Sequence, residues 1–195
     1  RLQNEDVTLN APQKGDIDVS LDSLTAAKAY AVDDNERYDG VEVSSYDSDF
    51  ITTLAFNVGK YGAFNEENMP ESYNVRRAIS LAIDQQELID SVLYGKGTRV
   101  GDGLVQETYP HALKNADGSY RAHETDAELA NRLLDEAGYT KNSDGTRDLS
   151  FRILASTGAE TLVNAIGKQL KEKLGITIVF DLAKSDYSEV IKQSN

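Results

Sequence analysis

Apolar side chains recur at helical spacing through the middle of the chain. Four of them predict one buried helix face: Val75, Ile79, Ala82 and Ile83. Asp84 interrupts this pattern and can cap a second helix, with Glu87 in the capping-box position. The second helix has its own apolar face, formed by Leu88, Ile89, Val92 and Leu93. Gly95 is expected to end it, because glycine enters the left-handed conformation at a helix C-terminus at little cost.

Alternation of apolar and polar residues predicts strands elsewhere. The predicted strands lie at residues 17–21, 41–46, 50–58, 149–155 and 176–182, with a further short one at 7–9. Helices are predicted at residues 25–32 and 161–174, and after Asp186. The last two strands flank the helix at 161–174, and such a crossover gives parallel neighbours in one sheet. Because strands alternate with helices, the predicted fold class is α/β.

A long connection without a clear period covers residues 98–120. A loop of this length is unusual in a compact domain unless it packs or binds something. The helix that follows is predicted to start at a capping box of Thr125 and Glu128, with a buried stripe of Ala127, Ala130, Leu134 and Ala137. Residues 142–148, NSDGTRD, lack the first acid and the bidentate glutamate of a calcium loop, so they predict a β-turn. No internal repeat is evident.

Composition and charge exclude several classes of function. The 195 residues include 33 acidic and 20 basic side chains, and the net charge of −13 argues against nucleic acid and anionic membrane surfaces. Cysteine is absent, which excludes disulfides and thiolate metal sites. His111 and His123 have no partner at metal-ligand spacing, and no phosphate loop or nucleophile elbow occurs. We therefore expect no metal, no cofactor and no enzymatic activity.

Three segments carry a resemblance to a known family. Residues 56–97 contain FN followed by VRRAISLAIDQQELIDSVLYGKG, residues 133–139 read LLDEAGY, and residues 14–19 read KGDIDV. In this order the segments resemble the extracellular solute-binding proteins of ABC transporters, in the large peptide- and nickel-binding family. The resemblance implies a class II periplasmic-binding-protein-like lobe with a mixed sheet flanked by helices. It also implies that this chain is an internal piece of a longer protein.

The resemblance further implies a domain organisation and a function. Residues 1–46 would end the ligand-contacting lobe, 47–53 would cross between lobes, and 54–195 would form most of the second lobe. The protein would bind peptides, or a related small solute, and deliver them to ABC-transporter permease subunits. It would be a monomer, extracellular or periplasmic, anchored as a lipoprotein. The alternatives are a peptide-pheromone receptor of the same architecture and, on an α/β scaffold, a hydrolase or transferase.

Five residues are candidates for the ligand site through this resemblance. Asp22 and Ser23 match the loop after the Gly-x-x-Asp strand, where Asp22 would hold a peptide amino group; alternatively, either residue caps the next helix. Thr52 and Thr53 match strand positions beside the ligand, or are simply the two faces of a strand. Asn57 either contacts the ligand or orients the loop after the strand.

Further side chains were considered for the same cleft. Tyr46, Tyr61 and Phe64 could line it, although core packing is the preferred interpretation. Arg76 and Arg77 are interpreted as structural, one near the buried face and one in solvent. In many family members, the acid that anchors the ligand amino group follows the segment matching residues 186–195. We therefore expect residues outside this chain to complete the site.

Overall fold

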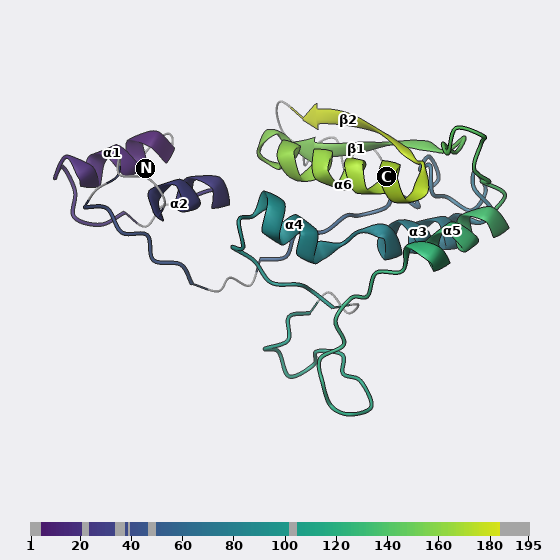
Figure 1. Ribbon diagram of the computed structural model, residues 1–195, viewed down its shortest axis with the longest axis horizontal. Coiled ribbons are helices and arrows are strands. Elements are labelled where there is room, and N and C mark those ends of the chain that lie inside the picture. Colours follow the sequence, from purple (N-terminus) through teal and green to yellow (C-terminus); the bar gives the residue numbers. More distant parts are fainter. Residues whose placement is uncertain are drawn as a thin grey trace. The chain divides into compact units, whose positions relative to one another are not determined.

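The computed structural model describes residues 5–20, 24–33, 38, 40–46, 50–101 and 105–183 (Figure 1). The chain divides into two units. The first unit is Arg1–Phe50 with Ile89–Thr98, and the second unit is Ile51–Leu88 with Arg99–Asn195. The division between Phe50 and Ile51 falls within residues 47–53, where the family resemblance implies a crossing between lobes. The assignment of lobes to these segments stays a prediction.

The first unit is built on two short helices, α1 (Glu5–Gln13) and α2 (Ala26–Asp33). Leu9, Val32 and Tyr38 form its small buried cluster. Lys28 Nζ lies 2.5 Å from Asp6 Oδ1, and this ion pair joins α2 to α1. The Tyr30 ring stacks on Tyr94 with the centroids 4.9 Å apart. The helix predicted at residues 25–32 is therefore confirmed as α2.

Four strands predicted in or next to this unit were wrong. Residues 7–9 lie within α1, and the described residues of the segments 17–21 and 41–46 are irregular. Residues 50–58 also form no strand. The physical reason is that alternation specifies which side chains share a face but not a partner for the ladder of hydrogen bonds. No segment among the described residues supplies that partner. The helix predicted after Asp186 lies outside the described residues.

The two consecutive helices at the centre of the chain are confirmed as α3 (Ser72–Ala82) and α4 (Gln85–Val92). Asp84 caps α4, because its Oδ1 accepts a hydrogen bond from the Glu87 N–H at 3.1 Å. The rest of the predicted capping box is replaced by Gln169, which accepts from the Asp84 N–H and donates to Glu87 Oε2. The start of α4 is thus fixed by a residue 85 positions away. Gly95 has φ 75°, as its predicted role at the helix end requires.

The predicted βαβ unit is also confirmed. Strand β1 (Ser150–Ser156) runs parallel to β2 (Thr177–Ala183), with Ile153 opposite Phe180. A short 3-10 turn, η2 (Thr157–Ala159), leads into the connecting helix α6 (Glu160–Leu174). Helix α6 packs against both strands, and α3 and α5 (Ala127–Glu136) pack against each other and against α6 (Figure 1). The fold class is α/β, as predicted.

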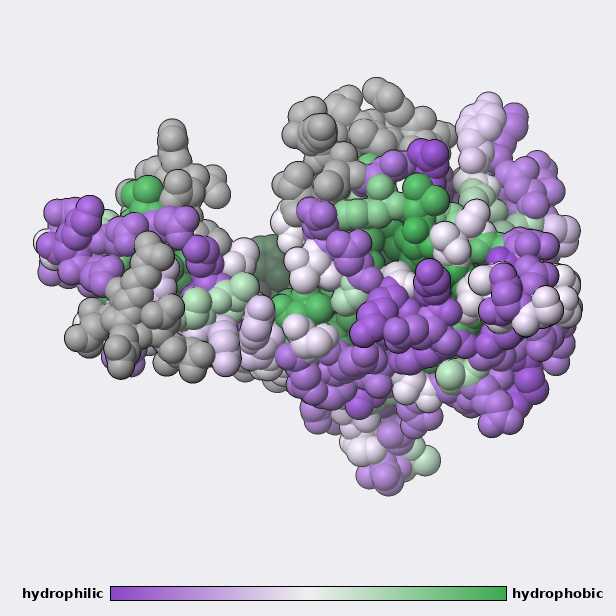
Figure 2. Space-filling model, turned by 45° about the horizontal axis from the view of Figure 1, so that its top comes forward, coloured by the Kyte–Doolittle hydropathy of each residue, from purple (hydrophilic) through white to green (hydrophobic). Residues whose placement is uncertain are grey.

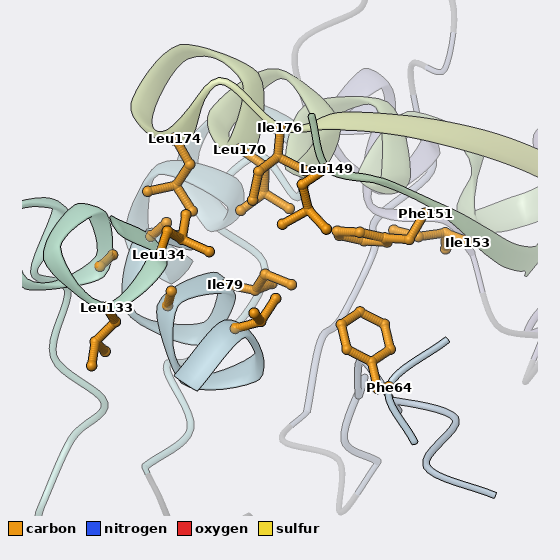
Figure 3. Close-up of a cluster of buried hydrophobic side chains, with 14 of the residues drawn as sticks. Phe64, Ile79, Leu133, Leu134, Leu149, Phe151, Ile153, Leu170, Leu174 and Ile176 are labelled. Atoms are coloured by element: carbon orange, nitrogen blue, oxygen red, sulfur yellow. The ribbon is translucent and has the colours of Figure 1, made fainter. Parts of the chain in front are cut away.

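The core of the second unit lies where these elements meet. Figure 3 shows side chains of α3, α5, α6 and β1 converging there. The largest side chains that are fully buried are Ile79, Leu134, Leu170, Leu174, Ile176 and Val75. Helix α5 starts one residue later than predicted, because Asp126 and not Thr125 accepts the capping hydrogen bond from Leu129 N–H. The Asp126 N–H donates to the Leu81 carbonyl at the end of α3, which fixes this start.

Two hairpins in the second unit share a sequence and a hydrogen-bond pattern, so a short internal repeat exists after all. Residues 114–120 read KNADGSY, and residues 141–147 read KNSDGTR. In the second hairpin, hydrogen bonds from the hydroxyl and the amide of Thr146 hold the pKa of Asp144 below its usual range. Ser119 lowers the pKa of Asp117 in the same way. Both segments are turns closed by their own side chains, as predicted for the second.

Arg147 ends the second hairpin and is buried, with a side chain only 1% exposed. Its Nε donates to the Leu174 carbonyl at 2.9 Å, at the end of α6. Its Nη1 donates to Asp135 Oδ1 at 2.5 Å and to the Tyr139 carbonyl. Its Nη2 donates to Asn131 Oδ1 at 2.8 Å. One guanidinium group therefore joins the ends of α5 and α6 to the hairpin.

Gly175 allows the hairpin to approach α6 this closely. It has φ 73°, and a Cβ at this position would lie 2.2 Å from the Gly145 carbonyl oxygen. We predict that Gly175→Ala destabilises the protein by about 2 kcal/mol or more, through the left-handed backbone and the clash. Gly167, inside α6, is the matched control, since an added Cβ there meets only Ile178 Cβ at 3.9 Å. Gly167→Ala should stabilise by about 0.5–1 kcal/mol. Urea unfolding of both variants checks this, and equal effects would contradict it.

The buried guanidinium gives a second stability prediction. Arg147→Met should cost about 3 kcal/mol or more, because one buried and two partly buried acceptors lose their donor and Asp135 loses its ion pair. The control is Arg152→Met, which removes an exposed arginine paired with Asp181 at 2.9 Å on β2. That change should cost at most about 1 kcal/mol. Thermal unfolding compares the two, and an Arg147→Met protein as stable as Arg152→Met would show that the buried contacts contribute little.

Candidate functional site

The segment of residues 51–56 carries two of the predicted ligand residues. Thr52 and Thr53 are both exposed, whereas Leu54 and Phe56 are half-buried against the core of the second unit. The Phe56 ring meets Phe64 edge-on, with centroids 4.9 Å apart, and Phe64 meets Phe151 of β1 at 5.4 Å. The core therefore holds this segment in place while its threonines face solvent.

The main chain of this segment has no hydrogen-bond partner among the described residues. Among the residues that the structure describes, none accepts from or donates to the backbone of residues 51–56. Exposed N–H and C=O groups in a row are the feature that an added strand pairs with.

Asn57 begins a polar loop that we call the asparagine loop, residues 57–65. Its Oδ1 accepts from the Gly59 N–H at 3.0 Å, and its carbonyl accepts from the Phe64 N–H at 3.2 Å. Asn65 Nδ2 donates to the Val58 carbonyl at 3.1 Å. The Asn57 side chain therefore organises the loop, which is the structural one of its two predicted roles; whether it also contacts a ligand stays a prediction.

Gly62 and Asn68 complete the closure of the asparagine loop. Asn68 Nδ2 donates to the Gly62 carbonyl at 3.1 Å, and the Gly62 N–H donates to the Gly59 carbonyl at 2.8 Å. A Cβ at Gly62 would lie 2.1 Å from the Asn57 carbonyl oxygen, so only glycine fits there. The loop is thus closed by contacts within the chain.

The aromatic candidates divide in two. Phe64 is buried in the core, as preferred from the sequence. For Tyr46 and Tyr61 the core interpretation was wrong, since they are 91% and 79% exposed. Both lie on irregular segments, where the hydrophobic period gives no face to bury. The sequence interpretation therefore did not predict that Tyr61 is exposed. Tyr61 lies between two glycines, Gly59 and Gly62, and this spacing indicates a short surface loop.

Lys60 precedes Tyr61 on the asparagine loop and is exposed as well. Its Nζ lies 5.7 Å from the centre of the Tyr61 ring, a cation–π arrangement. Lys60 forms no ion pair with any carboxylate of the described residues. Most of the face shown in Figure 2 is hydrophilic, and the chain as a whole is strongly acidic. An available cation beside an aromatic ring is therefore a distinct chemical feature of this loop.

Asp22 and Ser23 lie outside the described residues. The cap position before α2 is held by Thr25, whose hydroxyl accepts from the Lys28 N–H at 3.4 Å. Arg76 and Arg77 follow the sequence interpretation. Arg76 is half-buried and its Nε donates to the Ser72 carbonyl, while Arg77 is exposed.

The described part of the chain offers few other features that could bind a ligand or a metal ion. It contains no group of three or more histidine, cysteine or acidic residues placed to bind a metal ion. His123 Nε2 lies 2.9 Å from the Ser80 carbonyl and serves to hold the long loop. No helix of the described residues has the length and apolar character to cross a membrane. A surface depression of about 480 Å³ is lined by Asn131, Asp135, Thr140, Lys141 and Arg147. Two of these residues, Asn131 and Asp135, accept hydrogen bonds from the buried Arg147 guanidinium.

Comparison with solved structures defines the class of protein. The fold is that of class II periplasmic binding proteins. An ABC transporter substrate-binding protein from Sinorhizobium meliloti aligns with a TM-score of 0.63 at 19% identity, over 96% of this chain and 38% of that one. NikA from Brucella suis, in complex with Fe(III)-EDTA, aligns with a TM-score of 0.54 at 25% identity, over 71% of this chain and 27% of that one.

Residues 2–193 match the model of one protein family, the bacterial extracellular solute-binding proteins, family 5 (middle region), and the chain belongs to this family. The resemblance drawn from the sequence motifs is thereby confirmed. This is a family of transport receptors and not of enzymes. Heme-binding protein A of Haemophilus influenzae is 34% identical over 80 residues, which are 40% of this chain and 14% of that protein. The chain spans well under half the length of these relatives.

Proposed function

We propose that this chain is part of the substrate-binding component of an ABC importer. The family match across residues 2–193 supports the receptor role. The observation that carries the ligand class is the backbone of residues 51–56, which has no partner within the described residues. A peptide in extended conformation supplies matching donors and acceptors, so a peptide is the ligand that this segment fits best.

The five residues identified from the sequence are proposed ligand contacts. Thr52 and Thr53 stand on the unpaired segment, and Asn57 stands where it enters the asparagine loop. Asp22 is proposed to hold the amino group of a peptide, with Ser23 beside it. Because Thr25 caps α2, the helix does not require Asp22 as its cap.

The remaining features of the proposal come from the family. The family is described as extracellular, so we place the protein outside the cytoplasmic membrane. The lipoprotein anchor and the monomeric state are proposed from the resemblance of the sequence motifs. Its partners would be the permease subunits of the importer. A second ligand class is a metal chelate or heme, because relatives of this chain are a heme-binding protein and a protein solved with Fe(III)-EDTA.

Peptide binding should raise the melting temperature of the full-length protein. A ligand that binds only the folded state stabilises it by about 2.7 kcal/mol at a hundredfold excess over Kd. Asp22→Asn should weaken binding of tri-alanine more than binding of N-acetyl-tri-alanine, because only the first has a charged amino group. Equal loss for both peptides would mean that Asp22 does not hold the amino group.

Heme and Fe(III)-EDTA serve as comparison ligands in the same melting experiment. A shift with either of them, and none with peptides, would replace peptides by chelates as the ligand class. Absence of any shift with all of these ligands would contradict the receptor function proposed here.

A further inference from the structure

We propose that Lys60 and Tyr61 form a contact for a carboxylate-bearing end of the ligand. This inference rests on the proposed receptor function and adds two residues to its site. Neither was among the ligand residues predicted from the sequence motifs.

The loop that carries the pair is closed by its own hydrogen bonds. The side chains of Asn57, Asn65 and Asn68 close the asparagine loop through hydrogen bonds. The loop is so tight at Gly62 that a Cβ added there would clash with the Asn57 carbonyl. A tyrosine on such a loop presents a large contact surface at low entropic cost, since it has only two side-chain torsions to order. Tyr61 is 79% exposed, so its ring is available for contact.

The charge of Lys60 is not paired with a carboxylate of the described residues. The chain has 13 more acidic than basic side chains, and Lys60 still has no carboxylate partner among the described residues. Its Nζ lies 5.7 Å from the centre of the Tyr61 ring. An ammonium group held beside a ring can donate hydrogen bonds to a carboxylate on one side while the ring packs on the adjacent apolar atoms. A peptide C-terminus has this chemistry, and so does an aminocarboxylate chelate.

Lys60 and Tyr61 also lie close in sequence to the unpaired segment. The pair follows Asn57 by three and four residues, and Asn57 itself follows the unpaired segment at 51–56. A ligand strand paired with that segment would therefore end near the asparagine loop, where its terminal charge needs a partner.

The test compares tri-alanine with its C-terminal amide, by calorimetric titration of the full-length protein. The wild type should bind the acid about three- to tenfold more tightly than the amide, as one charge-assisted contact implies. Lys60→Gln should abolish this preference. Tyr61→Ser should weaken acid and amide alike, by about three- to tenfold, and Tyr61→Phe should bind both as the wild type does.

Tyr73→Ser is the matched control. Tyr73 is also exposed, at 62%, and also lies near a cation, with Arg76 6.0 Å from its ring, but it stands on α3 and not on the asparagine loop. It should bind both peptides as the wild type does. An unchanged acid preference in Lys60→Gln, or equal losses in Tyr61→Ser and Tyr73→Ser, would overturn the inference while leaving the receptor function intact.

Fe(III)-EDTA separates the two sources of carboxylate. If the wild type binds this chelate and no peptide, and Lys60→Gln weakens it, the carboxylate contact stands and the peptide class fails. If the wild type binds none of the three ligands, the proposed function fails and this inference fails with it.

Discussion

The second unit depends on one buried cation. Arg147 can be taken out of water only because four acceptors surround its guanidinium group, one of them the Asp135 carboxylate. These acceptors belong to α5, to Tyr139 just after it and to the end of α6, whereas Arg147 itself ends the hairpin that links α5 to β1. The ends of both helices must therefore meet at the hairpin. Gly175 is a consequence of the same constraint, because the hairpin backbone leaves no room for a side chain there.

From this point the structure extends toward the candidate ligand residues through packed elements. Strand β1 begins three residues after Arg147 and brings Phe151 against Phe64. Phe64 in turn holds Phe56 and the end of the asparagine loop. The threonines and the Lys60–Tyr61 pair therefore stand on backbone that the core positions. Binding residues supported in this way lose little freedom when a ligand arrives.

The sequence predicted the elements whose signals are local. Periodicity at residues 75–93 and 149–182 gave α3, α4, β1, α6 and β2, and Gly95 gave a helix end. It failed where a distant residue decides the outcome. Gln169 replaces half of the capping box at Asp84, and the Leu81 carbonyl selects Asp126 over Thr125 as the cap of α5. Arg147 had no signal at all, since an arginine in a turn-forming sequence is normally solvated.

The candidate site shows the same division. The motif around Asn57 located the asparagine loop, and the hydrogen bonds of Asn57 explain why an asparagine stands there. Among the described residues the strand predicted at 50–58 is not formed, and the unpaired backbone of residues 51–56 is the observation that points to a peptide ligand. Exposure of Tyr61 depends on how the loop closes, which a pattern of residue types does not specify.

The most direct test of this account is amide hydrogen exchange in the full-length protein, with and without tri-alanine. The account predicts slow exchange at the Arg147 amide, which donates to the Gly175 carbonyl at 2.9 Å, unchanged by the peptide. It predicts fast exchange at residues 51–56 without peptide and clear protection there when peptide is bound. Saturating peptide that leaves residues 51–56 unprotected would contradict the account.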